Sequence, residues 1–164
     1  MALTELILLL ACATAPGRVE GRSFVLPGAG VALDWPSPWT IVIDPKLFRS
    51  DLPDLVLEGR AEETLVALSF HPMPGAATLN VHSALDELML RWPTPPEAHG
   101  AGYSLQRLPW CDGAIEQGVK AEDGRLFLRY AWTTPAGLAV LSAWSPSGDP
   151  DRALTRDLVC GRPR

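Results

Sequence analysis

The chain has 164 residues, of which 47% are hydrophobic, so it is long enough for one domain with a substantial core. Its formal net charge is −5 at pH 7, which argues against a general affinity for nucleic acid or for anionic lipid surfaces. No internal repeat and no low-complexity tract is present.

An almost purely apolar run, residues 6–15, lies near the start of the chain. It is too short to cross a bilayer as a helix, which needs about 20 residues. The run ends in the small residues of ACATA, and Pro16-Gly17 then breaks any helix. Glu5 has the wrong sign for the first region of a signal peptide. We interpret residues 1–15 as a signal peptide or lipoprotein signal, and the alternative is a buried segment of a cytosolic protein.

Cys12 leaves two kinds of processing open. LLAC, which ends at Cys12, resembles a bacterial lipobox, in which the cysteine receives a diacylglycerol and becomes the mature N-terminus. Leu10 departs from the small residue usual at its position. The alternative is simple cleavage after Ala13, and in a third interpretation Cys12 is only a small apolar residue. The first two predict an exported protein (periplasm, outer envelope or extracellular), with a possible membrane contact through a lipid anchor at Cys12.

The other two cysteines are Cys111 and Cys160. An even number of remaining cysteines in an exported chain predicts one disulfide between them. In a cytosolic chain the same two residues would be separate buried thiols. No closely spaced set of cysteines and histidines is present, so neither a zinc site nor another metal site is expected.

Residues 16–22 are expected to form a short tether, and residues 23–164 a single domain dominated by strands. VALDW (residues 31–35) alternates apolar with small or polar residues, which predicts a half-buried strand. Pro36-Ser37-Pro38 forces a turn, because proline fixes its φ and lacks an N–H donor. WTIVID (residues 39–44) should then return as the partner strand.

Another strand pair and a helix should follow. LVLEG (residues 55–59) and TLVALSFH (residues 64–71) are typical of strands joined by a turn. Residues 80–92 have helical spacing of apolar side chains, with Thr78 or Asn80 as cap. The apolar positions of this helix are Val81, Leu85, Leu88, Met89 and Trp92.

Four strands and a terminal helix complete the predicted order. The strands are expected at residues 103–108, 114–121, 126–133 and 138–144. Turn signals such as Asp112-Gly113 and Asp123-Gly124 separate them, so they should form an antiparallel meander. Asp149 should cap the last helix, with Pro150 at its first position. The fold class is therefore α+β, an antiparallel sheet covered by two helices in the order ββββαββββα.

The junction LDWPSPWTI (residues 33–41) has a strand that meets Pro36, and Trp39 opens the next strand three residues later. This junction and the element order resemble the PsbP-like superfamily. That group includes an extrinsic photosystem subunit, a nuclear-import Ran-binding factor and many exported bacterial proteins. The resemblance covers most of residues 23–160. It implies a PsbP-like sandwich with a binding or assembly role and no catalytic residues to carry over, and a different antiparallel α+β fold is the alternative.

Standard catalytic and cofactor motifs are absent, so no catalytic residue and no cofactor is predicted. The three histidines are His71, His82 and His99. One of them could serve a small exported hydrolase together with a serine and a carboxylate. The positions of all three also fit ordinary surface use.

Two features could bind a partner. Arg125, Phe127 and Arg129 alternate in RLFLRYAW, so they should share one strand face. Arginines beside an aromatic ring can bind an acidic or aromatic partner, although arginine stems lying over Phe127 would give the same pattern. Trp110, in the turn beside Cys111, is the best candidate for an exposed tryptophan, and the alternative is a ring packed over the disulfide.

The leading functional hypothesis is a non-catalytic, exported binding or assembly module. Its partner is expected to be another protein and not a nucleic acid. One alternative is the hydrolase described above. Another is an immunity or chaperone protein for a secreted toxin, a role that some PsbP-like domains are thought to have. The sequence does not indicate the oligomeric state.

Overall fold

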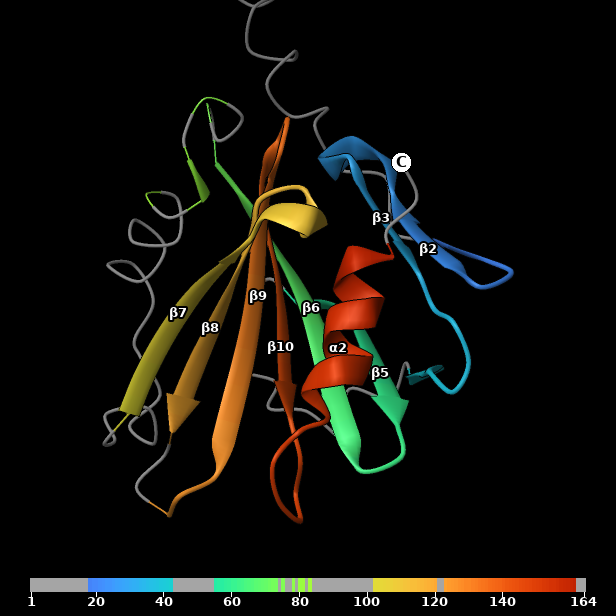
Figure 1. Cartoon of the computed structure of the whole chain (residues 1–164). Coiled ribbons are helices and arrows are strands. Elements are labelled where there is room, and N and C mark those ends of the chain that lie inside the picture. The colour runs from blue at the N-terminus through green and yellow to red at the C-terminus, as the bar shows by residue number, and fades with distance from the viewer. Residues whose placement is uncertain are drawn as a thin grey trace, which may run out of the picture.

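The structure is a computed structural model that describes residues 18–42, 55–73, 75, 78, 80, 81, 83, 102–120 and 123–161 (Figure 1). In these residues one large antiparallel sheet carries a helix and a small antiparallel sheet on the same face. The predicted class, α+β with an antiparallel sheet, is therefore confirmed. The expectation of a single domain over residues 23–164 stays a prediction.

The large sheet has seven strands in the order β4-β5-β6-β10-β9-β8-β7. They are β4 (Thr40–Val42), β5 (Leu55–Ala61), β6 (Thr64–Pro72), β7 (Gly102–Leu108), β8 (Ala114–Lys120), β9 (Leu126–Thr134) and β10 (Gly137–Trp144). Strands β7 to β10 form the predicted meander, with each strand antiparallel to the next. Strand β10 then pairs with β6 and joins the meander to the earlier strands.

The small sheet has the order β1-β2-β3. Its strands are β1 (Arg18–Glu20), β2 (Ser23–Leu26) and β3 (Val31–Asp34). One expectation is wrong here, and one strand was not expected. Residues 18–20 belong to a strand and not to a tether, and β2 was not predicted at all. Strand β1 is held by its antiparallel pairing with β2, and three residues are too few to show a periodic pattern.

The predicted hairpin around Pro36 and Pro38 is also wrong. Strand β3 pairs with β2 in the small sheet, whereas β4 pairs with β5 in the large sheet. The connection turns at a hydrogen bond of 2.9 Å that Trp39 N donates to Pro36 O. Because neither proline has an N–H donor, the chain cannot continue a ladder through this connection, and it crosses to the other sheet.

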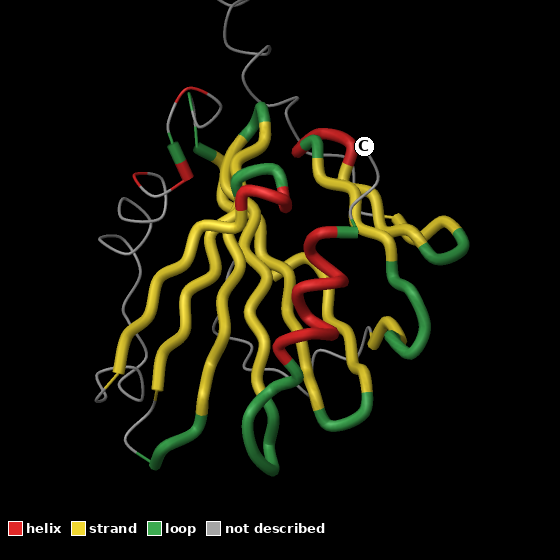
Figure 2. Tube along the Cα trace, in the orientation of Figure 1, coloured by secondary structure: helices red, strands yellow, loops and turns green. Residues whose placement is uncertain are grey.

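The core lies between the large sheet on one side and the helix with the small sheet on the other (Figure 2). Among its fully buried side chains are Leu33 from the small sheet, Leu68, Leu128, Tyr130 and Leu141 from the large sheet, and Leu158 and Val159 from the helix. Trp35 lies directly on Gly59, where an added Cβ would be 2.3 Å from Trp35 Cζ3. The rings of Trp35 and Trp39 meet edge to face, with centroids 6.2 Å apart.

The terminal helix, α2, spans Arg152–Cys160, where a helix was predicted. Its cap differs from the prediction. Asp151 Oδ1 accepts a hydrogen bond of 2.9 Å from Leu154 N, so Asp151 is the N-cap. Asp149 instead accepts a hydrogen bond of 3.0 Å from Leu126 N and ties this loop to the start of β9. Pro150 therefore precedes the cap.

The earlier predicted helix, residues 80–92, is described only at its start. Val81 and Ser83 have helical backbone, and Asn80 Oδ1 accepts a hydrogen bond of 2.8 Å from Ser83 N, as a cap residue does. The other residues of this segment lie outside those described. Among the described residues, six strands and not four precede residue 80. The order ββββαββββα is therefore not confirmed, and the second covering helix stays a prediction.

Candidate functional site

The connection from β7 to β8 carries the most exposed large apolar side chain of the described residues. It begins with a 3-10 turn, η5 (Pro109–Cys111), in which Trp110 is 63% exposed. Asp112 and Gly113 follow with φ values of 52° and 75°. Two successive residues in the left-handed region turn the chain sharply back into β8, which favours glycine at the second of them. Residues 109–113 are called the Trp110 turn below.

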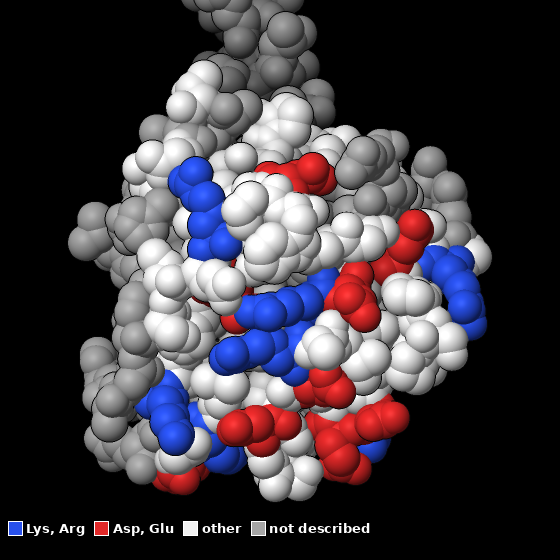
Figure 3. Space-filling view, in the orientation of Figure 1, with Lys and Arg blue, Asp and Glu red and all other residues white. Residues whose placement is uncertain are grey.

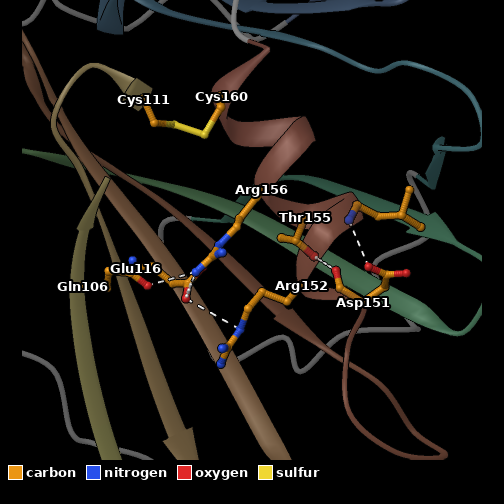
Figure 4. A network of polar contacts seen from close by, with 9 residues as sticks. Gln106, Cys111, Glu116, Asp151, Arg152, Thr155, Arg156 and Cys160 are labelled. Carbon is orange, nitrogen blue, oxygen red and sulfur yellow. Dashed lines mark hydrogen bonds and ion pairs between the residues drawn. A yellow bond between two sulfur atoms is a disulfide. The ribbon is translucent and has the colours of Figure 1, made fainter. Parts of the chain in front are cut away.

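A cysteine pair joins the Trp110 turn to the helix. The sulfur atoms of Cys111 and Cys160 are 2.21 Å apart, which is disulfide-bonding distance, so the predicted pairing has the geometry it needs (Figure 4). Cys160 is the last residue of α2, and Cys111, the residue after Trp110, is buried. The turn is thus held by β7 and β8 on the sheet side and by α2 on the other. An aromatic side chain on such an anchored turn loses little backbone freedom when it binds.

One helical turn before Cys160, α2 forms an ion cluster with β8. Glu116 is only 4% exposed. Arg156 donates through Nε to Glu116 Oε2 (2.6 Å) and through Nη2 to Oε1 (2.9 Å). The same Nη2 donates to Gln106 Oε1 (3.0 Å), and Arg152 Nε lies 3.6 Å from Glu116 Oε1. Two arginines of one helix therefore share a single carboxylate of the sheet (Figure 4).

The ionisation of this cluster follows from its contacts. Burial by itself would raise the pKa of Glu116, but the hydrogen bonds from Arg156, the nearby Tyr130 hydroxyl and the two guanidinium charges outweigh it, so this pKa lies below its usual range. Burial, together with the Glu116 carboxylate, raises the pKa of Tyr130. The hydrogen bond to Glu116 raises the pKa of Arg156. At neutral pH the cluster is an ionised Glu116 between two cationic arginines, next to a neutral tyrosine.

Beside this cluster, two side chains lean over a glycine of β8. A Cβ added to Gly118 would be 2.6 Å from Ser104 Oγ of β7 and 3.8 Å from Arg152 Nη2 of α2. A glycine inside a strand often marks a place where another group approaches the backbone closely. Figure 3 shows Lys and Arg atoms gathered at the middle of this face, between the meander and α2. We call the set Ser104, Gln106, Gly118, Arg152 and Arg156 the Gly118 cradle.

The predicted arginine–aromatic stripe is only partly assembled. Arg125 precedes β9 and pairs with Asp123, with Nε 2.5 Å from Asp123 Oδ2. Phe127 and Arg129 are half-buried within β9. They alternate with Leu128 and Tyr130 of the core, so they lie on the sheet face opposite α2. Whether Arg125, Phe127 and Arg129 bind a partner stays a prediction.

Trp110 and this stripe do not form one surface. Arg125 follows the turn after β8, whereas Trp110 precedes that strand, so they lie at opposite ends of it. Strand β8 has seven residues, which is a length of about 20 Å. The Trp110 turn contacts α2 through Cys111 and Cys160, and α2 lies on the sheet face opposite the stripe.

His71 is the one histidine among the described residues, and it contacts a serine. His71 Nε2 and Ser69 Oγ are 3.0 Å apart, and both residues are buried. The buried carboxylate of Glu58 is on β5 opposite Ala67, four residues from His71 along β6. Four residues of a strand span about 13 Å, so the backbone of Glu58 is far from that of His71. His82 and His99 lie outside the described residues.

No group of three or more His, Cys, Asp or Glu side chains in the described part of the chain is placed to hold a metal ion. Within residues 18–161, as far as they are described, no helix is long and apolar enough to cross a membrane. Cys12 and the predicted signal, residues 1–15, lie outside the described residues.

Sequence reasoning missed the Gly118 cradle and Glu116. A signal for part of it was present, because Arg152, Arg156 and Cys160 recur every four residues and therefore share one face of α2. If Cys160 faces the turn at Cys111, both arginines must face the same side. No comparable signal marks Glu116 or Gly118, whose importance depends on the register between β8 and β7.

A scan against protein-family models finds no match for this chain, and neither does a search of curated proteins. The PsbP-like resemblance and the binding or assembly role that it implies therefore stay predictions.

Proposed function

We propose that this protein is an exported, non-catalytic binding module that contacts a partner protein through the Trp110 turn. The observation that carries the proposal is the display of Trp110, which is 63% exposed on a turn joined to α2 through Cys111 and Cys160. Tryptophan is among the residues that most often dominate the energy of protein interfaces.

The contrast with the other described tryptophans supports this role. Trp35, Trp39 and Trp132 are between 2% and 6% exposed, and Trp144 is half-buried. The fold thus has room for large aromatic rings in its interior, yet Trp110 projects from it. A large ring that is held rigidly in water is suited to a pocket on another protein, because little side-chain and backbone entropy is lost on binding.

The cysteine pair supports export. Disulfides persist in oxidising compartments and are rare in the cytosol. A bond between Cys111 and Cys160 is therefore in keeping with a cleaved signal at residues 1–15. Lipidation of Cys12 and free secretion both remain compatible with this proposal, and each would place the protein where envelope or extracellular partners occur.

The contacts of Ser69 favour a structural role over a catalytic one. Ser69 Oγ donates a hydrogen bond of 3.3 Å to Val140 O across the sheet. With the hydroxyl proton directed to Val140 O, His71 Nε2 would supply the proton of the Ser69–His71 contact, and the tautomer of the ring sets these roles. A serine nucleophile needs the opposite arrangement, in which the histidine accepts the serine proton.

Site-specific photo-crosslinking in the native host tests the proposed contact. A photoreactive amino acid replaces Trp110 in one strain and Val19, which is 43% exposed on β1, in the control strain. We expect a discrete protein adduct from position 110 and none of that mass from position 19. Adducts of the same mass from both positions, or no adduct from position 110, would contradict the proposal.

A further inference from the structure

We infer that the Gly118 cradle binds a carboxylate of the partner protein, so that the segment recognised at the Trp110 turn is acidic. The inference rests on the proposed function and specifies the chemistry of the partner. The first observation is that Arg152 and Arg156, both on α2, differ in their contacts.

Arg156 is occupied by the protein itself. Its Nε and Nη2 both donate to Glu116, and Nη2 also reaches Gln106. Arg152 Nε approaches Glu116 Oε1 only to 3.6 Å, and the Arg152 side chain is 44% exposed. Figure 4 shows the outer end of its guanidinium pointing away from Glu116. Glu116 therefore acts as a positioning residue that holds Arg152 over Gly118.

Cationic side chains surround Glu116 although the chain as a whole is acidic. Around the buried Glu116 carboxylate lie Arg152, Arg156 and, further along the same face of β8, the exposed Lys120. Two acidic residues lie near the far end of this face, and both are engaged: Asp149 with Leu126 N and Asp123 with Arg125. The whole chain carries −5 and would repel an acidic partner, so any attraction for a carboxylate must come from these local cations.

The chemistry of Arg152 favours a carboxylate. A guanidinium offers parallel N–H donors in a fixed fork that matches the two oxygens of a carboxylate. Its Nη2 lies 3.8 Å from the position that a Gly118 Cβ would take, and 44% of the Arg152 side chain is exposed to solvent. Ser104 Oγ, on the other side of Gly118, supplies a further donor.

The spacing of the two contacts sets the ligand's length. Cys160, which pairs with the Cys111 next to Trp110, and Arg152 are eight residues apart on α2, which is about 12 Å along the helix axis. An extended segment covers about 12 Å in three to four residues. The partner should therefore present an apolar side chain to Trp110 and an Asp or Glu three or four residues away.

Peptide titration of the full-length oxidised protein, followed by backbone amide NMR shifts, tests this inference. The probe is a blocked tetrapeptide with phenylalanine first and glutamate fourth. The matched peptides carry glutamine or phosphoserine in place of glutamate. We expect the glutamate peptide to shift the amide signals of Gly118 and Arg152, and the glutamine peptide to bind about tenfold more weakly, since hydrogen bonds to charged groups are the stronger ones.

Variants separate the cradle from the Trp110 turn. Arg152→Gln should lower the affinity for the glutamate peptide to that for the glutamine peptide. The control is Arg60→Gln, because Arg60 is exposed and its Nε bonds to Glu62 O. This substitution should leave the affinity for both peptides unchanged. Trp110→Ala should weaken both peptides by the same factor. Arg152→Lys keeps the positive charge but loses the two parallel N–H donors of the guanidinium. Its affinity for the glutamate peptide should lie between those of the wild type and Arg152→Gln.

Four outcomes would overturn the inference. The first is equal affinity for the glutamate and glutamine peptides in the wild type, which needs no variant to fold. The second is tighter binding of the phosphoserine peptide, which would assign the cradle to phosphate. The third is a concentration-dependent dimer in sedimentation that Arg152→Gln abolishes, which would make a second copy of the chain the occupant. The fourth is an effect of Arg60→Gln equal to that of Arg152→Gln. In each case crosslinking at position 110 can still succeed, so the two proposals fail separately.

Discussion

Gly59 and Gly118 occupy corresponding places in the large sheet, each on the second strand from an edge, and both face the side that carries α2. At each of them a Cβ would collide with a neighbour. The neighbour differs in kind. Over Gly59 it is the indole of Trp35, which is 2% exposed, and over Gly118 it is Ser104 Oγ with the guanidinium of Arg152 nearby.

This difference shows that a glycine in a strand does not by itself indicate a binding site. At Gly59 the space is filled by an apolar ring that belongs to the core, and the position is closed. At Gly118, which is buried, the nearest group is the hydroxyl of the exposed Ser104, followed by Leu126 Cδ1 and by the guanidinium of Arg152, whose side chain is 44% exposed. The chemistry of the covering side chain therefore decides between a packing role and a binding role.

The largest effect is expected from Gly59→Ala. The new Cβ would overlap Trp35 Cζ3 at 2.3 Å and Cη2 at 2.8 Å inside a packed core. Overpacking of this kind should lower the free energy of unfolding by about 3 kcal/mol, measured by urea denaturation. In a Trp35→Phe background the overlapping ring atoms are absent, so the cost of Gly59→Ala should be smaller there. Strict additivity of the two substitutions would contradict the contact.

Glu116→Gln should have the next largest effect. It removes the charge that both arginines of α2 share, while Arg152 and Arg156 remain partly exposed to water. We expect a loss of about 2 kcal/mol in the free energy of unfolding. The control is Asp123→Asn at the exposed Arg125 pair, where no measurable change is expected. Equal stability of Glu116→Gln and wild type would show that the cluster does not hold α2 to the sheet.

Gly118→Ala should cost less than Gly59→Ala, and this sharpens the comparison directly. Its Cβ would meet the end of a flexible serine side chain, which can rotate away, and not a buried ring. We expect a loss of about 1 kcal/mol, and less in a Ser104→Ala background. Binding of the glutamate peptide should fall more than stability does, because the new methyl lies beneath Arg152. A stability loss as large as that of Gly59→Ala would mean that both positions are closed core.

The pH dependence should be the smallest effect. Because the folded pKa of Glu116 lies below the usual value of 4.5, the unfolded chain takes up a proton at higher pH than the folded one. The contribution of Glu116 is present above pH 4.5 and is lost as the pH falls through the folded pKa. Below pH 4.5 the free energy of unfolding should therefore fall less steeply with decreasing pH in Glu116→Gln than in the wild type. Parallel curves would contradict this linkage.

Much of the fold followed from local patterns. The turn pairs at residues 112–113 and 123–124 together with alternating apolar residues predicted the meander, and helical spacing predicted α2. The small sheet was not predicted, because β1 is defined by its pairing with β2 and not by its own three residues. The wrong hairpin at residues 36–38 has a related cause: prolines mark a turn but do not indicate which strand the chain pairs with afterwards.

For the candidate site, too, some properties were predicted from the sequence and others are seen only in the structure. The sequence alone placed Trp110 in a turn beside Cys111 and, for an exported chain, predicted the pairing of Cys111 with Cys160, because a turn pattern and a cysteine count need no tertiary information. Only the tertiary structure decided that Trp110 is exposed and that Arg152 is held over Gly118 by Glu116. These properties come from strand register and from the docking of α2, in which residues distant in sequence meet, and no spacing along the chain contains that information.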